Sequence, residues 1–223
     1  MKIKAIITGS TGMVGKGVLL ECLENPQVAS VLVINRQSLG LKHEKLKEII
    51  HPDFHDFSSI AGELRGFNAC FFCLGVSAAG LSEAAYSRIT YEVTLKFAET
   101  LVLINPELTF CYVSGAGTDH TEKSNMMWAR VKGKTENALL QLPFKAVYLF
   151  RPGFIQPMKG IRSRTPLYNT IYTLLTPLYP LLKIFPSLAT NTEKMGKAMI
   201  NVIVKGYDKT RLENTDINRL AAQ

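Results

Sequence analysis

The sequence has no internal repeat, no low-complexity tract and no flexible linker. It also lacks an uninterrupted apolar signal segment at its start, because Lys2 and Lys4 break the first apolar run. Hydrophobic residues make up 47% of the 223 positions, which excludes a disordered chain and provides for a substantial core. We therefore expect one folded domain of ordinary size, residues 1–223, located in the cytoplasm.

Cysteine and histidine are scarce, with four of each. Cys70 and Cys73 form a C-x-x-C pair, but both lie in the apolar run 69–74, where residues three apart point to opposite faces of a strand. Cys22 lies on a helix pattern and Cys111 on a strand pattern, and no His spacing completes a zinc site. The sequence thus predicts buried, reduced thiols and no metal.

Acidic residues are rare in the last third of the chain. Residues 151–223 contain 11 Lys and Arg against 4 Asp and Glu, whereas residues 1–150 contain 15 against 14. This excess either serves solubility or attracts an anionic substrate, a nucleic acid or a lipid surface.

Residues 167–185 approach the length of a membrane span, but two prolines, Asn169 and Lys183 interrupt them. A broken helical cap over a substrate pocket is the better interpretation, and peripheral membrane contact is the lesser one. A further helix is expected after Thr190-Asn191-Thr192-Glu193, which has the pattern of a capping box.

Apolar runs of strand length alternate with segments of helical spacing. The runs lie at residues 2–8, 30–36, 47–51, 69–74, 108–114 and 145–151, and the clearest helical segments at 13–24, 82–105 and 126–140. The runs are nearly continuous, as in strands that are buried on both sides. This order predicts an α/β fold with a parallel sheet and helices on both faces.

Three glycines are concentrated where the first apolar run ends, in Thr8-Gly9-Ser10-Thr11-Gly12-Met13-Val14-Gly15. The spacing differs by one residue from G-x-G-x-x-G, but each glycine has the same task. Gly9 makes the turn, Gly12 lets the backbone approach a diphosphate, and Gly15 lets the helix pack closely on the strand. Because the N-terminus of a helix favours negative charge, this loop predicts a dinucleotide site.

The second apolar run ends in Asn35-Arg36, about 20 residues beyond the glycines, where a Rossmann unit places the residue that reads the ribose. An acidic residue there binds a bare 2′-hydroxyl and repels a 2′-phosphate. Arg36 does the reverse, so NADP is favoured over NAD, unless Arg36 is merely solvated.

Together these residues resemble the short-chain dehydrogenase/reductase superfamily, in particular its atypical, epimerase-like NAD(P)-binding members. The resemblance covers nearly the whole chain. Its matches are residues 8–15, Asn35-Arg36, Asp53-Phe54, Cys73-Leu74-Gly75, Ser114, Lys132 and Arg151-Pro152-Gly153, in that order.

The resemblance also implies roles for individual residues. Asp53 is expected to read the adenine amino group, with Phe54 beside it, and Cys73, Leu74 and Gly75 to lie along the cofactor. Lys132 is expected to bind the nicotinamide ribose, and Pro152, Gly153 and Ile155 to border the nicotinamide. The alternatives are a solvated Asp53, a surface Lys132 and a plain turn at Pro152-Gly153.

One residue of the superfamily's catalytic set is missing. Its chemistry needs a tyrosine four residues before the lysine, and that position is Trp128, whose indole does not ionise usefully near neutral pH. Ser114 remains to orient the substrate oxygen. The catalytic candidates are therefore Ser114, Lys132 and Trp128 in the tyrosine position, and His120 is a possible proton donor or a plain loop residue.

The sequence therefore predicts a Rossmann-type doubly wound parallel sheet with a small C-terminal helical cap. Residues 1–153 form the nucleotide-binding core, and residues 154–223 form the substrate cap and closing elements. The expected function is hydride transfer between NADP(H), or else NAD(H), and a small carbonyl or sugar-nucleotide substrate, and the basic last third of the chain fits an anionic one. The alternative is a catalytically weak NADP(H)-binding redox sensor. No nucleic acid is expected, and a homodimer through helices 82–105 and 126–140 is possible.

Overall fold

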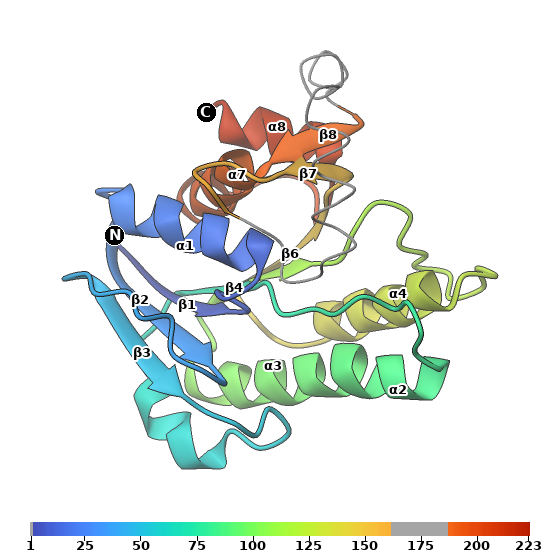
Figure 1. Ribbon diagram of the computed structural model, residues 1–223, viewed down its shortest axis with the longest axis horizontal. Coiled ribbons are helices and arrows are strands. Elements are labelled where there is room, and N and C mark those ends of the chain that lie inside the picture. The colour runs from blue at the N-terminus through green and yellow to red at the C-terminus, as the bar shows by residue number, and fades with distance from the viewer. Residues whose placement is uncertain (1, 162–186) are drawn as a thin grey trace.

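The main sheet is built from parallel strands in the order β3-β2-β1-β4-β5-β6-β9 (Figure 1). A computed structural model describes residues 2–161 and 187–223 of the chain. The strands are β1 Ile3–Thr8, β2 Val28–Asn35, β3 Leu46–Ile50, β4 Ala69–Phe72, β5 Thr109–Val113, β6 Ala146–Arg151 and β9 Arg211–Glu213. The strand order reverses between β1 and β4, and the loops that follow these two strands diverge there.

Helices cover both faces of this sheet, so the predicted doubly wound α/β fold is confirmed. One face packs against α1 Met13–Glu24, α7 Thr192–Lys205 and α8 Asn214–Ala221. The other packs against α2 Glu83–Ser87, α3 Val93–Ile104, α4 Met127–Leu140 and a 3-10 helix, Ser58–Leu64. Each of the six expected strands is present, with ends that differ by at most two residues from the apolar runs.

Residues along each strand alternate between two separate apolar layers. In β1, Ala5 and Ile7 belong to the layer under α1 and α7, whereas Ile6 belongs to the layer under α3. Cys70 lies in the second layer, and Cys73 packs against the first. All four cysteines are free, and all except the half-buried Cys73 are buried, so the C-x-x-C pair is not a shared site.

The predicted helix 82–105 is interrupted. Between α2 and α3 the backbone forms a five-residue π turn, Arg88–Glu92. Just beyond it, the Thr94 hydroxyl donates to the Thr90 carbonyl oxygen at 2.5 Å. A hydroxyl that bonds back to the preceding turn competes with the regular helix ladder, and helical periodicity alone does not reveal this competition.

The C-terminal elements complete the core. Strand β9 pairs with β6 and extends the main sheet, and α7 lies directly on α1. This approach requires glycine, because a Cβ at Gly17 would lie 2.5 Å from the Cβ of Thr192, and one at Gly196 would lie 2.6 Å from that of Glu21. A small second sheet joins β7 Phe154–Gln156 to β8 Ala189–Asn191.

Helix α7 begins at Thr192 and is capped by Asn191, the last residue of β8, whose Oδ1 accepts the Lys194 N–H at 2.7 Å. The proline-interrupted stretch 167–185 lies outside the described residues. Among the helices within 2–161 and 187–223, none is long and apolar enough to cross a membrane.

Candidate functional site

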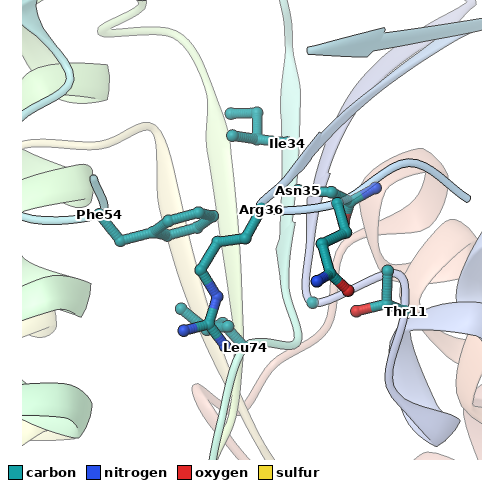
Figure 2. Close-up of a pocket in the computed structure, with 8 residues that line it drawn as sticks. Thr11, Ile34, Asn35, Arg36, Phe54 and Leu74 are labelled. Carbon is teal, nitrogen blue, oxygen red and sulfur yellow. The ribbon is translucent and has the colours of Figure 1, made fainter. Parts of the chain in front are cut away.

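Two adjoining pockets, of about 370 and 520 Å³, lie at the carboxyl ends of the strands, where the strand order reverses. The first is lined by Gly9, Thr11, Ile34, Asn35, Arg36, Gln37, Phe54 and Leu74 (Figure 2). The second is lined by Gly9, Thr11, Gly12, Met13, Val14, Arg36, Cys73, Leu74, Gly75, Val76, Ser77, Val113, Ser114, Gly115, Lys132, Pro152, Gly153 and Ile155. Because the two pockets share Gly9, Thr11, Arg36 and Leu74, they form one continuous groove.

The glycine turn has the geometry that the sequence indicates. Gly9 has φ +69°, and a Cβ there would lie 2.6 Å from the carbonyl carbon and oxygen of Cys73. A Cβ at Gly15 would lie 2.3 Å from the Gly9 carbonyl oxygen, so a side chain at Gly15 would push helix α1 away from the turn. Gly9 thus makes the turn, and Gly15 allows the close packing behind it.

The N-terminus of α1 opens onto the groove. Gly12 is its N-cap residue and has no side chain to cap it, and the first turn carries no acidic residue. Gly12, Met13 and Val14 all line the second pocket. The positive end of the helix dipole is therefore available to an anion in the groove.

Arg36 is exposed and extends between Phe54 and Leu74 in the first pocket (Figure 2). Within the part of the chain that the structure describes, its guanidinium has no hydrogen bond or ion pair. A cation without a protein partner, placed beside an aromatic ring, can pair with a phosphate and stack on a planar group.

Asn35 has a structural role that the sequence did not reveal. Its Oδ1 accepts from Ser10 Oγ, and its Nδ2 donates to Glu48 Oε1, both at 2.8 Å. Glu48 also accepts from Ser38 Oγ and from the Leu39 N–H. Burial opposes the ionisation of Glu48, but these hydrogen bonds outweigh it and lower the pKa of its carboxyl. Asn35 thus ties the glycine loop to strand β3.

A buried polar cluster lies behind the other end of the groove. Ser114 Oγ donates to Glu136 Oε1 at 2.6 Å, and Arg151 meets the same carboxylate through Nε at 3.0 Å and Nη2 at 2.5 Å. Arg211 Nε lies 3.6 Å from Glu136 Oε2, and Arg151 Nη1 also bonds Glu213 at 3.2 Å. Glu136 has no exposed surface. The available sequence signal was its position four residues after Lys132, on the same face of α4.

Lys132 reaches from α4 to the wall of the second pocket. Its Nζ donates to the carbonyl oxygen of Ser114. Burial lowers the pKa of this ammonium to about 8, and the nearby Glu136 carboxylate opposes the decrease only in part.

The four remaining predicted site residues line neither pocket as far as the described residues show: Ser10, Gly15, Asp53 and Trp128. Ser10 is buried and donates to Asn35, and Gly15 packs against the backbone of Gly9. Asp53 is exposed, and its carboxylate accepts the His55 N–H at 2.8 Å. The half-buried Trp128 lies over the loop after β5, since a Cβ at Gly117 would be 3.3 Å from its Cη2 atom.

The described lining of the groove contains no carboxylate. The same part of the chain has no group of three or more His, Cys, Asp or Glu residues that could hold a metal ion. The groove therefore combines a helix N-terminus with two cations, Arg36 where the two pockets meet and Lys132 in the second pocket, and a lining of mixed polar and apolar surface. This arrangement is suited to an elongated anionic ligand with planar groups.

The strand order, the glycine turn and the groove at the reversal point together define a Rossmann-type α/β fold. No protein-family model matches the chain. Two curated relatives are protein HTATIP2 of Rattus norvegicus, 28% identical over 67% of this chain and 61% of that protein, and the mitochondrial protein fmp52 of Emericella nidulans, 28% identical over 67% and 65%. The chain thus matches less than two thirds of the length of each.

Solved structures agree on the fold. A short chain dehydrogenase family protein from Francisella tularensis has a TM-score of 0.63 at 17% identity, over 92% of this chain and 93% of that one. The enzyme WbmF of Bordetella bronchiseptica, in complex with NAD+ and UDP, has a TM-score of 0.67 at 17% identity, over 99% and 76%. The resemblance to the short-chain dehydrogenase/reductase superfamily is therefore confirmed at the level of the fold.

Proposed function

We propose that the groove binds a nicotinamide dinucleotide along its whole length, and that the protein transfers a hydride between this cofactor and a small carbonyl or sugar-nucleotide substrate. The glycine turn carries this proposal, because it brings backbone amides and the positive end of α1 to a groove that also contains the cations Arg36 and Lys132. WbmF, which shares the fold, has a crystal structure in complex with NAD+ and UDP.

The groove suggests how the two halves of the cofactor would be held. The adenosine half would occupy the first pocket beside Phe54, with Asp53 near its amino group, and the diphosphate would face Gly12, Met13 and Val14. The nicotinamide half would occupy the second pocket, along Gly75 and bordered by Pro152, Gly153 and Ile155. Lys132 would hold its ribose.

The preference for NADP over NAD rests on Arg36. Its guanidinium is exposed in the first pocket without a partner in the described chain, so it is free to pair with a 2′-phosphate. The Glu48 carboxylate lines neither pocket and already accepts three hydrogen bonds, from Asn35, Ser38 and Leu39. NAD remains the alternative cofactor.

When bound, the nicotinamide supplies or accepts the hydride. The residues of this chain position the reaction. Ser114 and Lys132 lie side by side at the second pocket, where a substrate oxygen would be oriented, and Val76, Val113 and Ile155 give that end an apolar wall that excludes water.

A redox sensor is the second candidate, because Trp128 occupies the position of the superfamily's tyrosine. A sensor would bind the cofactor without turning over. We also propose that the protein acts in the cytoplasm and forms a homodimer. The fungal relative fmp52 is named as a mitochondrial protein.

Calorimetry with NADPH and NADH tests the cofactor. We expect NADPH to bind at least about tenfold more tightly, and Arg36→Ala to remove most of that difference, since one charge-assisted pair contributes roughly 1.5–3 kcal/mol. Arg65→Ala, at an exposed site away from the groove, is the matched control. If neither coenzyme binds, the proposed function is wrong.

NADPH oxidation over a panel of carbonyl compounds then separates the enzyme from the sensor. Turnover by the wild type supports the enzyme, and binding without turnover supports the sensor. Trp128→Tyr is expected to raise turnover if its new phenol reaches the groove from the position that the indole occupies.

A further inference from the structure

Few groups in the second pocket can exchange a proton near neutral pH. Apart from Arg36, which stays protonated, the titratable side chains in its described lining are Cys73 and Lys132. Burial raises the pKa of the Cys73 thiol to about 12, so this thiol keeps its proton. Among the described residues that line the second pocket, this leaves Lys132 as the candidate for proton exchange.

The hydroxyl of Ser114 cannot donate to a substrate. Both of its hydrogen-bond neighbours are acceptors: Glu136 Oε1 at 2.6 Å and the Phe150 carbonyl oxygen at 3.2 Å. The single hydroxyl proton is therefore committed to the interior, and the charge of Arg151 on Glu136 keeps that acceptor strong. Ser114 presents only a lone pair to the groove.

The other two candidates stand outside the groove. Trp128 lies over Gly117, and its indole N–H does not ionise usefully. His120 is exposed in the loop after β5, and only its backbone carbonyl, which accepts from Asn137 Nδ2 at 2.8 Å, ties it to α4. Neither side chain lines the second pocket.

Lys132 has the placement that proton transfer needs. It lies at the wall of the second pocket, held by its bond to the Ser114 carbonyl, and its Nζ would be 3.9 Å from a Cβ at Gly115. The charged group that acts on it is Glu136, one helical turn away, and most of that negative charge is neutralised by Arg151. The desolvated ammonium consequently has a pKa of about 8, close to the operating range of a catalytic acid.

We infer that Lys132 is the catalytic acid and base of this groove, in place of the absent tyrosine. In the reducing direction, a hydride from the reduced dinucleotide adds to the carbonyl carbon, and the carbon–oxygen π pair moves to oxygen. That oxygen takes one proton from the Lys132 ammonium, which becomes an amine and regains a proton from water. In the oxidising direction, the Lys132 amine would take the hydroxyl proton of an alcohol, and the hydride on the alcohol carbon would pass to the oxidised dinucleotide.

This inference rests on the proposed function, but its first test needs neither cofactor nor substrate. The wild-type protein is briefly acetylated with acetic anhydride at a series of pH values, and the modified lysines are mapped by mass spectrometry. We expect the reactivity of Lys132 to be half-maximal near pH 8. Half-maximal reactivity near the ordinary lysine pKa of about 10.4 would overturn the inference.

The second test compares two arginine variants on α4. Lys132→Arg keeps a cation for the ribose but cannot release a proton near neutral pH, so NADPH affinity should stay within about threefold while turnover falls about 10²–10⁴-fold. Lys134→Arg, at an exposed site on the same helix, should turn over within about twofold of the wild type.

The outcomes separate the two proposals. Turnover of Lys132→Arg within about threefold of the wild type would overturn the inference alone. Binding of NADPH by the wild type without any turnover would also overturn it and would leave the cofactor site intact. Loss of all coenzyme binding would overturn the proposed function itself. If Lys132→Arg does not fold, half-maximal acetylation of wild-type Lys132 at about pH 10.4 would still overturn the inference.

Discussion

Glu136 holds together the buried polar cluster behind the second pocket. Its buried carboxylate is shared by Ser114, Arg151 and, at a longer distance, Arg211. Ion pairs of this kind are costly to break from one side, because the remaining charge stays buried without its counterpart. The pair therefore sets the orientation of Ser114 as well as local stability.

We expect Glu136→Ala to lower the free energy of unfolding by about 3–5 kcal/mol, measured by urea denaturation. Glu213→Ala is the control, because Glu213 pairs with the same Arg151 but is 55% exposed. Its loss should cost only about 1 kcal/mol, including its contribution as the N-cap of α8. Equal losses of stability in the two variants would show that the buried Glu136–Arg151 pair contributes no more than the exposed Glu213–Arg151 pair.

Lys132 should also make stability depend on pH. Because its pKa is about 8 in the folded chain and about 10.4 in an unfolded one, the unfolded state holds more protons between these values. The free energy of unfolding should therefore rise with pH between about 8 and about 10.4. Below about pH 8 Lys132 is charged in the folded state, and its burial then lowers the stability.

The measurement compares the wild type with Lys132→Met in urea at pH 7.5 and pH 10. Relative to the variant, the wild type should gain roughly 1–2 kcal/mol at the higher pH. The comparison cancels the titration of the cysteines and tyrosines, which both proteins share. A difference that does not change with pH would contradict the lowered pKa of Lys132.

At the scale of elements, the loop between β5 and α4 is held tightly at both ends. Asp119 accepts from the hydroxyl of Thr121 and from the N–H groups of Thr121, Lys123 and Ser124, and these hydrogen bonds lower its pKa to about 2. The same loop passes so close to α4 that a Cβ at Gly133 would lie 1.7 Å from the Asp119 carbonyl oxygen. This contact fixes where Gly115 borders the second pocket.

Gly133→Ala is expected to lower the free energy of unfolding by about 3 kcal/mol, because backbone must move to admit the methyl group. Gly62→Ala is a suitable control: it lies in the 3-10 helix with open space around its Cβ, and it should change stability by less than about 1 kcal/mol. Thermal or urea denaturation of the two variants, made side by side, measures the difference. Similar stabilities would mean that the loop and α4 are loosely packed.

At the scale of the whole molecule, the groove crosses the sheet from the end of β2 to the end of β6. The loops after β1, β2 and β4 line both pockets, whereas Phe54, after β3, lines only the first and the residues after β5 and β6 line only the second. We therefore expect each pocket to bind its own half of a dinucleotide. The shared residues Gly9, Thr11, Arg36 and Leu74 lie at the junction.

Thermal denaturation with the separate halves tests this division. At about 100 times its Kd, each ligand should add roughly 2.7 kcal/mol to stability. Adenosine 2′,5′-bisphosphate should protect the wild type and fail with Arg36→Ala at the same concentration, whereas nicotinamide mononucleotide should protect both proteins equally. Protection by the bisphosphate that does not depend on Arg36 would argue against a 2′-phosphate site there.

The C-terminal part illustrates how the whole molecule overrules a local pattern. The change of composition after Gly153 suggests a separate cap, yet β9 extends the main sheet and α7 covers α1. The buried side chains Met195, Met199 and Leu212 belong to the same apolar layer as Ile7. The described residues after 187 are therefore part of the core, and the boundary at residue 153 stays a prediction.

The sequence by itself determined the strands, the long helices and the turn at Gly9, because apolar periodicity and the steric freedom of glycine act over a few residues. It also indicated most of the residues that line the groove, since the ends of parallel strands must meet at one edge of the sheet. Only the tertiary structure decided that Ser114 turns toward Glu136, that Asn35 binds Ser10 and Glu48, and that Trp128 lies over Gly117. The Ser10–Asn35 and Ser114–Glu136 contacts join segments that are far apart in the chain, and the sheet order brings them within hydrogen-bonding distance. The Trp128–Gly117 contact depends on how the loop after β5 folds back on α4, which no local pattern predicts.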